Sequence, residues 1–478
     1  MVFHRSSDTW RLGFPGEPHL PSCLSPTSSL EAEDLSPPTS ELKRIMEPSG
    51  YLWHCIRSHP GNDTAVFDLS TGTRVTWSQI RKRVVECLTT LEGLPEQSAV
   101  GLALPNSVDW IVRFLSLLCR RCPAVLLDAH APASTLTAHA RAAGARWMWQ
   151  HQGMTEVDPT AAPRPGIAAI KLTSGSTGLP KGVACSEAHL IADARQVVST
   201  MGIRPGDRQL ALIPLGHSYA LGNLVIPMLL KGNPLYTAPD FSPLQIPGWI
   251  QQHHLDVFPT VPIIIKYLTE SPSITSLSPL RTLISAGAPL RPELASAFAR
   301  RFGLLAHNFY GSSETGGICY DRTGEAGLTG RAVGSPLEGV GVSLSPEQCV
   351  VVSSPAVAAP EGIHTLEDTG CFNAMGELVL TGRTGEWVNV GGKKIRPEEI
   401  MHIALQHPLV RDAWAGKISR VDREWMKLVV ATDLSPEDIR RFFSEQLPSW
   451  KIPREIRCAS NLPRSARGKL DRTALESL

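Results

Sequence analysis

Short apolar runs alternate with amphipathic segments along the chain from about residue 65 to residue 311. The run AVFDL is typical of a strand, and the segment TWSQIRKRVVECLTTL after it places Val84, Leu88 and Leu91 on one face of a helix. The same order recurs where PAVLLD precedes STLTAHARAAGA and where RTLISAG precedes RPELASAFARRFG. Strands that alternate with helices predict an α/β fold with largely parallel, doubly wound sheets.

Four of the predicted strands are followed by loops of small and polar residues. These strands are IKLT, LIPL, LISAG and HNFYG. In a doubly wound fold, ligands bind outside the carboxyl ends of the strands. We therefore expect the loops after these strands to lie on one rim and to form the functional site.

The pattern changes after Gly311, where hairpin-like runs such as VGVSL, CVVVSS and ELVLTGR predict a β-rich subdomain. Beyond Thr384, helical and strand-like segments are mixed, which predicts a small α+β domain. The first residues are rich in Pro and Ser and bury too little apolar surface to offset the entropy of ordering. We therefore expect a disordered extension at residues 1–45, a large N-terminal domain at residues 46–383 and a small C-terminal domain at residues 384–478.

Composition narrows the function classes more than it changes the fold. Lys and Arg number 46 and Asp and Glu number 45, so the formal net charge of +1 argues against binding to nucleic acid or to an anionic membrane surface. No apolar stretch approaches the ~18 residues of a transmembrane helix, and the N-terminus lacks the apolar region of a signal peptide. Among the ten cysteines only Cys119 and Cys122 are closely spaced, and they follow an apolar run. We expect a cytoplasmic enzyme with reduced thiols, and we interpret this pair as buried or half-buried.

The segment TSGSTGLPKG, residues 173–182, directly follows the predicted strand IKLT. Glycines let backbone N–H groups approach a polyphosphate, hydroxyl groups add donors, and Lys181 adds a compact positive charge. The segment is not a Walker A loop, because proline precedes Lys181 and glycine follows it. Taken alone, such a loop is more often a flexible linker, but the strand before it and the motifs after it favour phosphate binding.

These motifs, taken in order, resemble those of the adenylate-forming superfamily, which includes acyl-CoA synthetases, aryl-CoA ligases, peptide-synthetase adenylation domains and beetle luciferases. TSGSTGLPKG is similar to the family's signature loop, and IPLGHSYAL, LISAGAPL and FYGSSETGG are similar to the segments that follow it. LEDTG through LTGR, VNVGGKKIRPEEI and LPRSARGKLDR complete the series. The resemblance runs from roughly residue 50 to the C-terminus and implies ATP-dependent activation of a carboxylic acid as an acyl-adenylate.

The resemblance also implies a role for each matching residue, because charge that builds around the α-phosphorus must be met by cations and N–H dipoles. Glu314 would bind Mg²⁺, His217 would line the carboxylate pocket, and Lys469 would bridge the ribose and the acyl oxygens. The residues implied to hold ATP are Thr173, Ser174, Gly175, Ser176, Thr177 and Lys181 in the phosphate loop, Ala286, Gly287, Ala288 and Tyr310 around the adenine, Gly311, Ser312 and Ser313 in the turn at the α-phosphate, and Asp368 with Arg383 at the ribose.

A second step is implied as well, in which the C-terminal domain rotates and the acyl group passes to a thiol. Gly385 stands where the family usually has a charged pivot residue, and glycine can absorb a large change in φ and ψ. We expect the thiol of CoA or of a carrier-protein phosphopantetheine as the acceptor. An amine or oxygen acceptor, or a nucleotide-binding homologue without catalysis, are the alternatives. Room for an aryl or medium acyl chain is predicted by small residues, namely Gly216, Ser218, Gly222, Ala286 and Ala288.

Overall fold

The computed structural model describes residues 50–173, 180–329, 332–384, 388–390, 393–420, 423–447, 449–465 and 468–478. Some of the predictions fall elsewhere: the extension at residues 1–45, the loop residues Ser174, Gly175, Ser176 and Thr177, and the pivot Gly385 lie outside the described residues. The domain limits at residues 383 and 384 stay a prediction.

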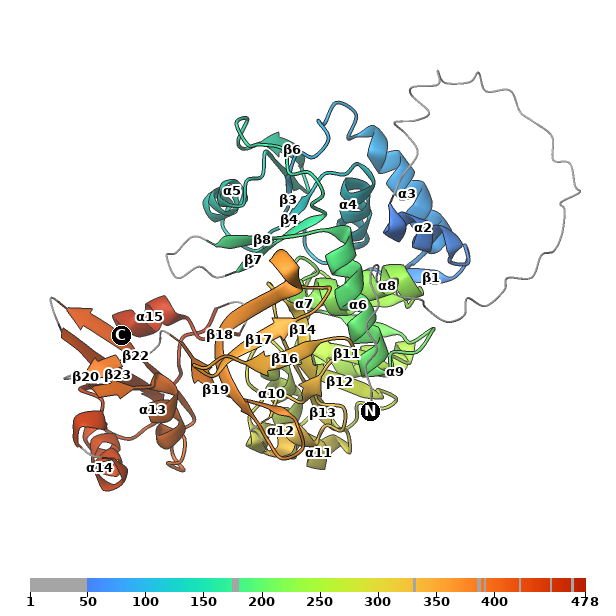
Figure 1. Ribbon diagram of the computed structural model, residues 1–478. Helices are drawn as coiled ribbons and strands as arrows, with labels where there is room; N and C mark the ends of the chain where they lie inside the picture. The colour runs from blue at the N-terminus through green and yellow to red at the C-terminus, as the bar shows by residue number, and fades with distance from the viewer. Residues whose placement is uncertain are drawn as a thin grey trace, which may run out of the picture. The chain divides into compact units, whose positions relative to one another are not determined.

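The largest sheet has nine strands in the order β15-β14-β13-β12-β11-β9-β10-β1-β2 (Figure 1). The strands from β13 to β1 in this order pair in parallel, whereas β2, β14 and β15 are antiparallel to their neighbours. The bounds are β1 Thr64–Asp68, β2 Thr73–Thr76, β9 Gln209–Ala211, β10 Leu235–Thr237, β11 Val257–Thr260, β12 Thr282–Ser285, β13 Ala306–Ser312, β14 Gly316–Tyr320 and β15 Ser335–Pro336. Because the parallel strands run the same way, their carboxyl ends meet at one edge of the sheet.

Helices cover both faces of this sheet, as a doubly wound fold requires. Leu283 of β12 packs in the core under α9, α10 and α11, whereas its neighbour Ile284 packs in the core shared with α6 and α8. Successive side chains of a strand point to opposite faces, so this split follows from the pleat. The helices are α6 Glu187–Met201, α8 Ile226–Lys231, α9 Ile246–His253, α10 Pro262–Glu270, α11 Pro292–Phe302 and, beside β13, α12 Glu325–Thr329.

A second, six-stranded sheet has the order β6-β5-β3-β4-β7-β8. Leu126 of β4 packs toward α4, and the preceding Val125 packs toward α5, so helices cover both faces here too. The strands are β3 Val100–Leu102, β4 Ala124–Leu126, β5 Trp147–Gln150, β6 Gly153–Glu156, β7 Ala169–Thr173 and β8 Lys181–Cys185, and the helices near the start of the described chain are α2 Tyr51–Ser58, α3 Trp77–Thr89, α4 Val108–Cys119 and α5 Ala133–Ala142.

Strand β7 is the predicted strand IKLT, and it belongs to the second sheet. The expectation that all four polar loops lie on the rim of one sheet is therefore wrong for the loop after β7. Alternation of strands and helices along a sequence predicts parallel strands, but it does not say which sheet each strand joins, because that choice depends on pairing between distant segments.

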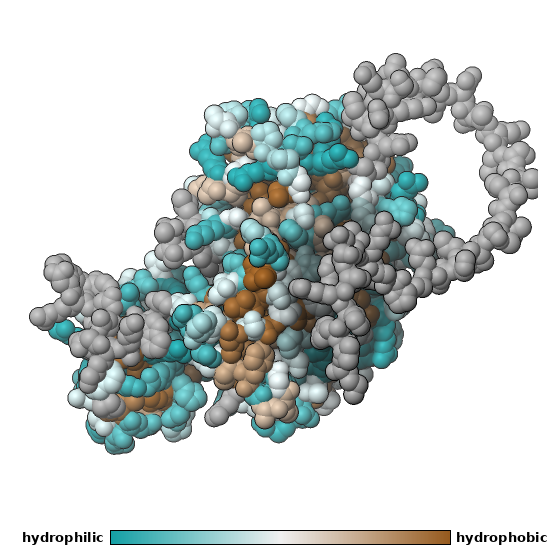
Figure 2. All heavy atoms as spheres, viewed as in Figure 1, coloured by the Kyte–Doolittle hydropathy of each residue, from teal (hydrophilic) through white to brown (hydrophobic). Residues whose placement is uncertain are grey.

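The β-rich part is a four-stranded antiparallel sheet in the order β16-β17-β18-β19. Its strands are β16 Gly341–Leu344, β17 Cys349–Ser353, β18 Ile363–Phe372 and β19 Leu378–Arg383. Val342 and Leu344 of β16 and Leu380 of β19 are partly buried against the core. Figure 2 shows apolar residues gathered on the visible surface over β14, β16 and β17.

The C-terminal part has a core of its own, in which Ile400, Leu428 and Phe443 are fully buried. Its strands form a two-stranded sheet, β20-β21, and a three-stranded sheet, β22-β23-β24. The bounds are β20 Val388–Val390, β21 Lys393–Ile395, β22 Asp412–Arg420, β23 Arg423–Ala431, β24 Glu455–Ala459, α13 Pro397–Ala404, α14 Pro436–Gln446 and α15 Arg472–Ser477. The predicted fold class, doubly wound α/β sheets with a β-rich subdomain and a small α+β unit, is confirmed.

Two further expectations concern cysteines and the membrane. Cys119 and Cys122 are both buried and form no disulfide, as predicted. Burial raises the pKa of Cys122 to about 11, which keeps this thiol protonated and poorly reactive. In the described ranges, no helix is both long enough and apolar enough to cross a bilayer.

Candidate active site

Three of the predicted loops meet at the carboxyl edge of the nine-stranded sheet. They follow β9, β12 and β13, and the strand order places β11 between β9 and β12. His217 lies in the loop after β9, and residues 286–288 directly follow β12. Tyr310 to Ser312 end β13, with Ser313 and Glu314 in the turn before β14. The sheet therefore brings these residues together.

The turn between β13 and β14 is held by its own hydroxyl groups. Ser312 Oγ accepts the backbone N–H of Glu314 at 3.2 Å and that of Thr315 at 3.2 Å. Ser313 Oγ donates to Ser218 Oγ at 3.0 Å, which joins the turn to the short helix α7 (Ser218–Ala220). The backbone of Glu314 is thus fixed while its side chain remains partly exposed, which is an arrangement suited to binding an ion at the rim.

His217 caps the N-terminus of α7. Its Nδ1 accepts the backbone N–H of Tyr219 at 3.2 Å, so in the neutral ring the proton lies on Nε2. A single π-helical turn, Leu221–Val225, follows α7 and is fully buried. Such turns are rare and are often found at functional sites. Periodicity alone does not distinguish them from an α-helix, and the sequence did not predict this one.

A buried carboxylate that the sequence did not point to, Asp193, supports the turn between β13 and β14. Asp193 of α6 is 4% exposed, and its Oδ1 accepts the backbone N–H of Gly317 at 2.9 Å. A Cβ atom at Gly316, whose φ is +74°, or at Gly222 would lie 2.5 Å from the carboxylate oxygens. Burial raises the pKa of Asp193, and the buried Lys171 of β7 partly offsets this effect. The sequence signal that could have identified Asp193 is an acidic residue on the apolar face of a helix.

Tyr310, Asp368 and Arg383 form a hydrogen-bonded group that joins the nine-stranded sheet to the β-rich sheet. The hydroxyl of Tyr310 donates to Asp368 Oδ2 at 2.6 Å, and Arg383 Nε donates to Asp368 Oδ1 at 2.7 Å. Asp368 and Arg383 are cross-strand partners on β18 and β19. Burial, and then the negative charge of Asp368, raise the pKa of Tyr310 well above its usual range. The phenol is therefore a hydrogen-bond donor at neutral pH.

The hairpin of β7 and β8 carries Thr173 and Lys181, the two described residues among those predicted to hold the phosphates. Thr173 ends β7 and Lys181 begins β8, and the two are paired in register. Thr173 Oγ1 donates to the carbonyl of Lys181 at 3.4 Å, and the Lys181 side chain is exposed. Thr173 and Lys181, the described ends of this segment, are thus held together.

Lys469 lies on a tight turn of the C-terminal part. The N–H of Ser465 donates to the Lys469 carbonyl at 2.7 Å, and the N–H of Gly468 donates to the Ser465 carbonyl at 2.9 Å. Gly468 meets α10, because a Cβ atom there would lie 2.8 Å from Cγ2 of Ile263. Since α10 begins directly after β11, the turn that carries Lys469 lies beside the carboxyl edge of the large sheet.

The described residues fit a magnesium ion that is bound partly by the substrate, and not one held by the protein alone. Across the described ranges, no group of three or more His, Cys, Asp or Glu side chains could hold a metal. Glu314 offers one partly exposed carboxylate in the turn. Mg²⁺ keeps several waters and is usually bound through one or two carboxylates and substrate phosphates. The donor set therefore fits an ion that arrives with a polyphosphate, and does not fit a metal cage made by the protein.

Comparisons with known proteins indicate the class to which the chain is similar. Residues 148–352 match the family model described as AMP-binding enzyme. The chain is 28% identical over 347 residues to the sulfoacetate–CoA ligase of Cupriavidus necator, which covers 66% of this chain and 68% of that protein. It is also 28% identical over 352 residues to the L-proline–[L-prolyl-carrier protein] ligase of Pseudomonas fluorescens, which covers 67% and 70%. The aligned segment thus spans about two thirds of each relative.

Among solved structures, ATP-bound MatB from Rhodopseudomonas palustris has a TM-score of 0.78 at 19% identity, and the match covers 89% of this chain and 98% of that chain. At this identity the likeness shows the fold. Fold, family match and relatives together define an enzyme of the AMP-binding ligase class. The family match and these relatives support the adenylate-forming superfamily.

Proposed function

We propose that the protein is an AMP-forming carboxylic acid:thiol ligase that takes an aryl or medium-chain acid. The observation that carries this proposal is the meeting of the Ser313–Glu314 turn, His217 and the Tyr310–Asp368 pair around one sheet edge. At this edge, the carboxylate of Glu314 can bind a metal ion, and the serine hydroxyl groups and His217 can bind an anion. The carboxylate of Asp368 can accept hydrogen bonds from the two ribose hydroxyls. Activation of a carboxylate by ATP requires these groups side by side.

In the first step, an oxygen of the acid attacks the α-phosphorus of ATP. The bond from this phosphorus to the bridging oxygen breaks, and pyrophosphate leaves with that electron pair. The N–H on Nε2 of His217 orients the acid, Lys181 and the loop hydroxyls hold the departing phosphates, and Asp368 accepts the ribose hydroxyls. When bound through Glu314, Mg²⁺ supplies positive charge that offsets the charge of the phosphates.

Lys469 contacts the oxygens between the ribose and the acyl group in this step. In the second step, a thiolate attacks the acyl carbon, AMP leaves with the electron pair of the mixed anhydride bond, and the thiol proton passes to solvent. CoA is the acceptor that we propose. A carrier-protein thiol is the second candidate, because one relative is a ligase of that kind.

Fewer residues support a wide acid pocket in the structure than the sequence alone suggests. A Cβ atom at Gly222 would meet Asp193, and one at Gly216 would lie 3.2 Å from the carbonyl of Leu127. Packing therefore explains both glycines without a substrate. Ser218, Ala286 and Ala288 remain as support for a pocket wide enough for an aryl or medium acyl group.

Acid-dependent exchange of labelled pyrophosphate into ATP tests the first step. A panel of hydroxybenzoates, cinnamates and fatty acids is expected to include at least one substrate. Glu314→Gln should abolish exchange, whereas Glu325→Gln, the same change at an exposed position of helix α12, should not. ATP binding without exchange for every acid would refute ligase activity and favour a nucleotide-binding homologue. If AMP is released only when a carrier protein with a free phosphopantetheine thiol is supplied, and not with CoA, the carrier protein is the acceptor.

A further inference from the structure

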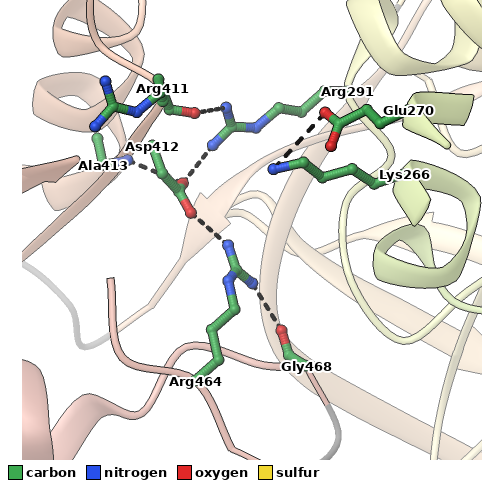
Figure 3. Close-up of polar contacts among 8 residues, drawn as sticks. All are labelled: Lys266, Glu270, Arg291, Arg411, Asp412, Ala413, Arg464 and Gly468. Carbon is green, nitrogen blue, oxygen red and sulfur yellow. Dashed lines mark hydrogen bonds and ion pairs between the residues drawn. The ribbon is translucent and has the colours of Figure 1, made fainter. Parts of the chain in front are cut away.

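One carboxylate joins three segments that are distant in the sequence (Figure 3). Asp412, the first residue of β22, accepts Nη2 of Arg291 on Oδ1 and Nη2 of Arg464 on Oδ2. The backbone N–H of Ala413 also donates to Oδ1 at 2.9 Å. We call Arg291, Asp412 and Arg464 the Asp412 cluster.

Each arginine of the Asp412 cluster makes a second hydrogen bond to a backbone carbonyl. Arg291 Nη1 donates to the carbonyl of Arg411 at 2.8 Å, and Arg464 Nη1 donates to the carbonyl of Gly468 at 2.7 Å. Figure 3 shows both guanidinium groups turned toward the same carboxylate. Two bonds per arginine fix its orientation, which a single point charge would not do.

The two arginines have different positions relative to the turn that carries Lys469. Arg464 lies at the start of this turn, and its bond to Gly468 spans the turn. Arg291 occupies the N-cap position of α11, in the loop after β12. Its side chain makes no capping hydrogen bond to this helix. Arg464 therefore joins the turn to β22, and Arg291 joins β22 to the part of the chain that carries the sheet edge.

The exposure of the Asp412 cluster indicates that its contacts can form and break. The side chains of Arg291 and Arg464 are 39% and 37% exposed, and that of Asp412 is 17% exposed. Ion pairs at this exposure contribute little to folding stability, because water competes for each charge. They are strong enough to shift an equilibrium between two positions of a docked segment, and weak enough not to prevent release.

We propose that Arg291 and Asp412 are positioning residues, which hold the turn of Lys469 beside the sheet edge during adenylation. The proposal rests on the proposed function, because Lys469 is assigned there to the first step. Loss of Arg291 leaves the Asp412–Arg464 pair and the turn intact and removes only the link to α11. Adenylation then slows, and thioester formation, which does not need Lys469 at this edge, does not.

Arg291→Ala is the main test, and Lys266→Ala is its matched control. Lys266 lies on the neighbouring helix α10, is 54% exposed, and pairs with Glu270 of the same helix at 3.9 Å. We expect Arg291→Ala to lower the pyrophosphate-exchange rate by roughly 3- to 10-fold. Thioester formation from supplied acyl-adenylate should stay within about twofold of the wild type. Arg291→Lys should recover part of the loss, since it keeps the charge and not the paired geometry.

A second measurement does not depend on activity. Hydrogen–deuterium exchange of the peptide that covers residues 464–470 should be faster in Arg291→Ala than in Lys266→Ala, because the turn is released from α11 more often. If the wild-type enzyme shows no pyrophosphate exchange with any acid, the proposed function is refuted. Deuterium uptake then tests by itself whether Arg291 positions the turn. Equal loss of both half-reactions in Arg291→Ala, or unchanged deuterium uptake, would overturn the proposal.

Discussion

Replacement of Tyr310 by phenylalanine tests the geometry of the nucleotide site with a single atom. The change removes the O–H that donates to Asp368 Oδ2 at 2.6 Å and keeps the ring. Arg383 still donates to the other oxygen at 2.7 Å, but its side chain is 48% exposed. Water therefore competes with Arg383 for the carboxylate, and the tyrosine is the stronger orienting contact.

A hydrogen bond to a charged group contributes about 1.5–3 kcal/mol. If the orientation of Asp368 is needed to receive the ribose, this energy is lost from nucleotide binding. The dissociation constants of ATP and AMP should then rise by roughly 10- to 100-fold, since about 1.4 kcal/mol corresponds to a factor of ten. Asp368→Ala should weaken binding at least as much, because it removes the acceptor itself.

Isothermal titration with AMP near pH 7.5 measures this effect without any knowledge of the acid. Tyr320→Phe is the matched control: it is the same chemical change on the neighbouring strand β14, at a ring that stacks on His307. Its affinity should be that of the wild type. If Tyr310→Phe binds AMP as the wild type does while Asp368→Ala does not, the tyrosine does not orient the acid. If neither variant changes the affinity, Asp368 is not at the nucleotide site.

The same variant has a signature in alkaline unfolding. Burial and Asp368 raise the pKa of Tyr310 above its usual value of 10.0, so the neutral phenol contributes stability below about pH 10. This stability is lost as the pH rises from 10 toward the folded pKa, by about 1.4 kcal/mol per pH unit. Unfolding free energies measured in urea between about pH 9.5 and 11 should therefore fall less steeply for Tyr310→Phe than for the wild type. Parallel curves would contradict the assigned environment of the phenol.

Three further predictions concern other parts of the site. Lys469→Ala should abolish pyrophosphate exchange and spare thioester formation from supplied acyl-adenylate, and equal loss of both steps would contradict its role. The pKa of Asp193 is raised from 3.8 by burial, so stability from its neutral form is lost as the pH rises through the folded pKa. Asp193→Asn, which can still accept the N–H of Gly317, should gain stability relative to the wild type as the pH rises above about 4 in urea unfolding, and a fall in this difference would refute the reasoning. Gly316→Ala should cost about 1–3 kcal/mol in the same assay, because φ is +74° and a Cβ atom would lie 2.5 Å from Asp193, and unchanged stability would show that the turn relaxes.

Local patterns in the sequence predict the elements well, and their pairing less well. The helix predicted after AVFDL begins at Trp77, where Thr76 and Gln79 form a capping box. Val84 is fully buried on its inner face and Leu88 is partly buried, whereas the helix ends at Thr89 and the buried Leu91 lies just beyond it. Period and capping are properties of neighbouring residues, so a sequence displays them. That β7 joins a different sheet from β9, β12 and β13 depends on contacts between distant strands, which no local pattern records.

The candidate site follows the same division. The glycine-rich loop, the Ser313–Glu314 turn and Asp368 stand out because their residue types fit poorly in a core and match a known series of motifs. Asp193 was missed because an acid in an amphipathic helix is ordinarily on the solvent face. Only the packing of α6 against β14 shows that its carboxylate accepts the N–H of Gly317. The Asp412 cluster was missed for a related reason, since its three residues come from the N-cap of α11, from β22 and from the Lys469 turn.

Gly222, which lies close to His217 in the sequence, shows how the buried carboxylate of Asp193 limits which substitutions can change the preferred substrate acid. Gly222 leaves space that the carboxylate of Asp193 fills, and the same carboxylate accepts the N–H of Gly317 in β14, next to the Glu314 turn. A larger residue at Gly222 would displace Asp193 and with it the turn that carries Glu314. Substitution there should therefore reduce adenylation of every acid alike. Substitution at Ala288, which is exposed after β12, meets no such constraint. A change in preference between short and long acids is therefore expected from Ala288→Leu and not from Gly222→Ala, and comparison of the two variants across the acid panel separates support of the turn from selection of the substrate.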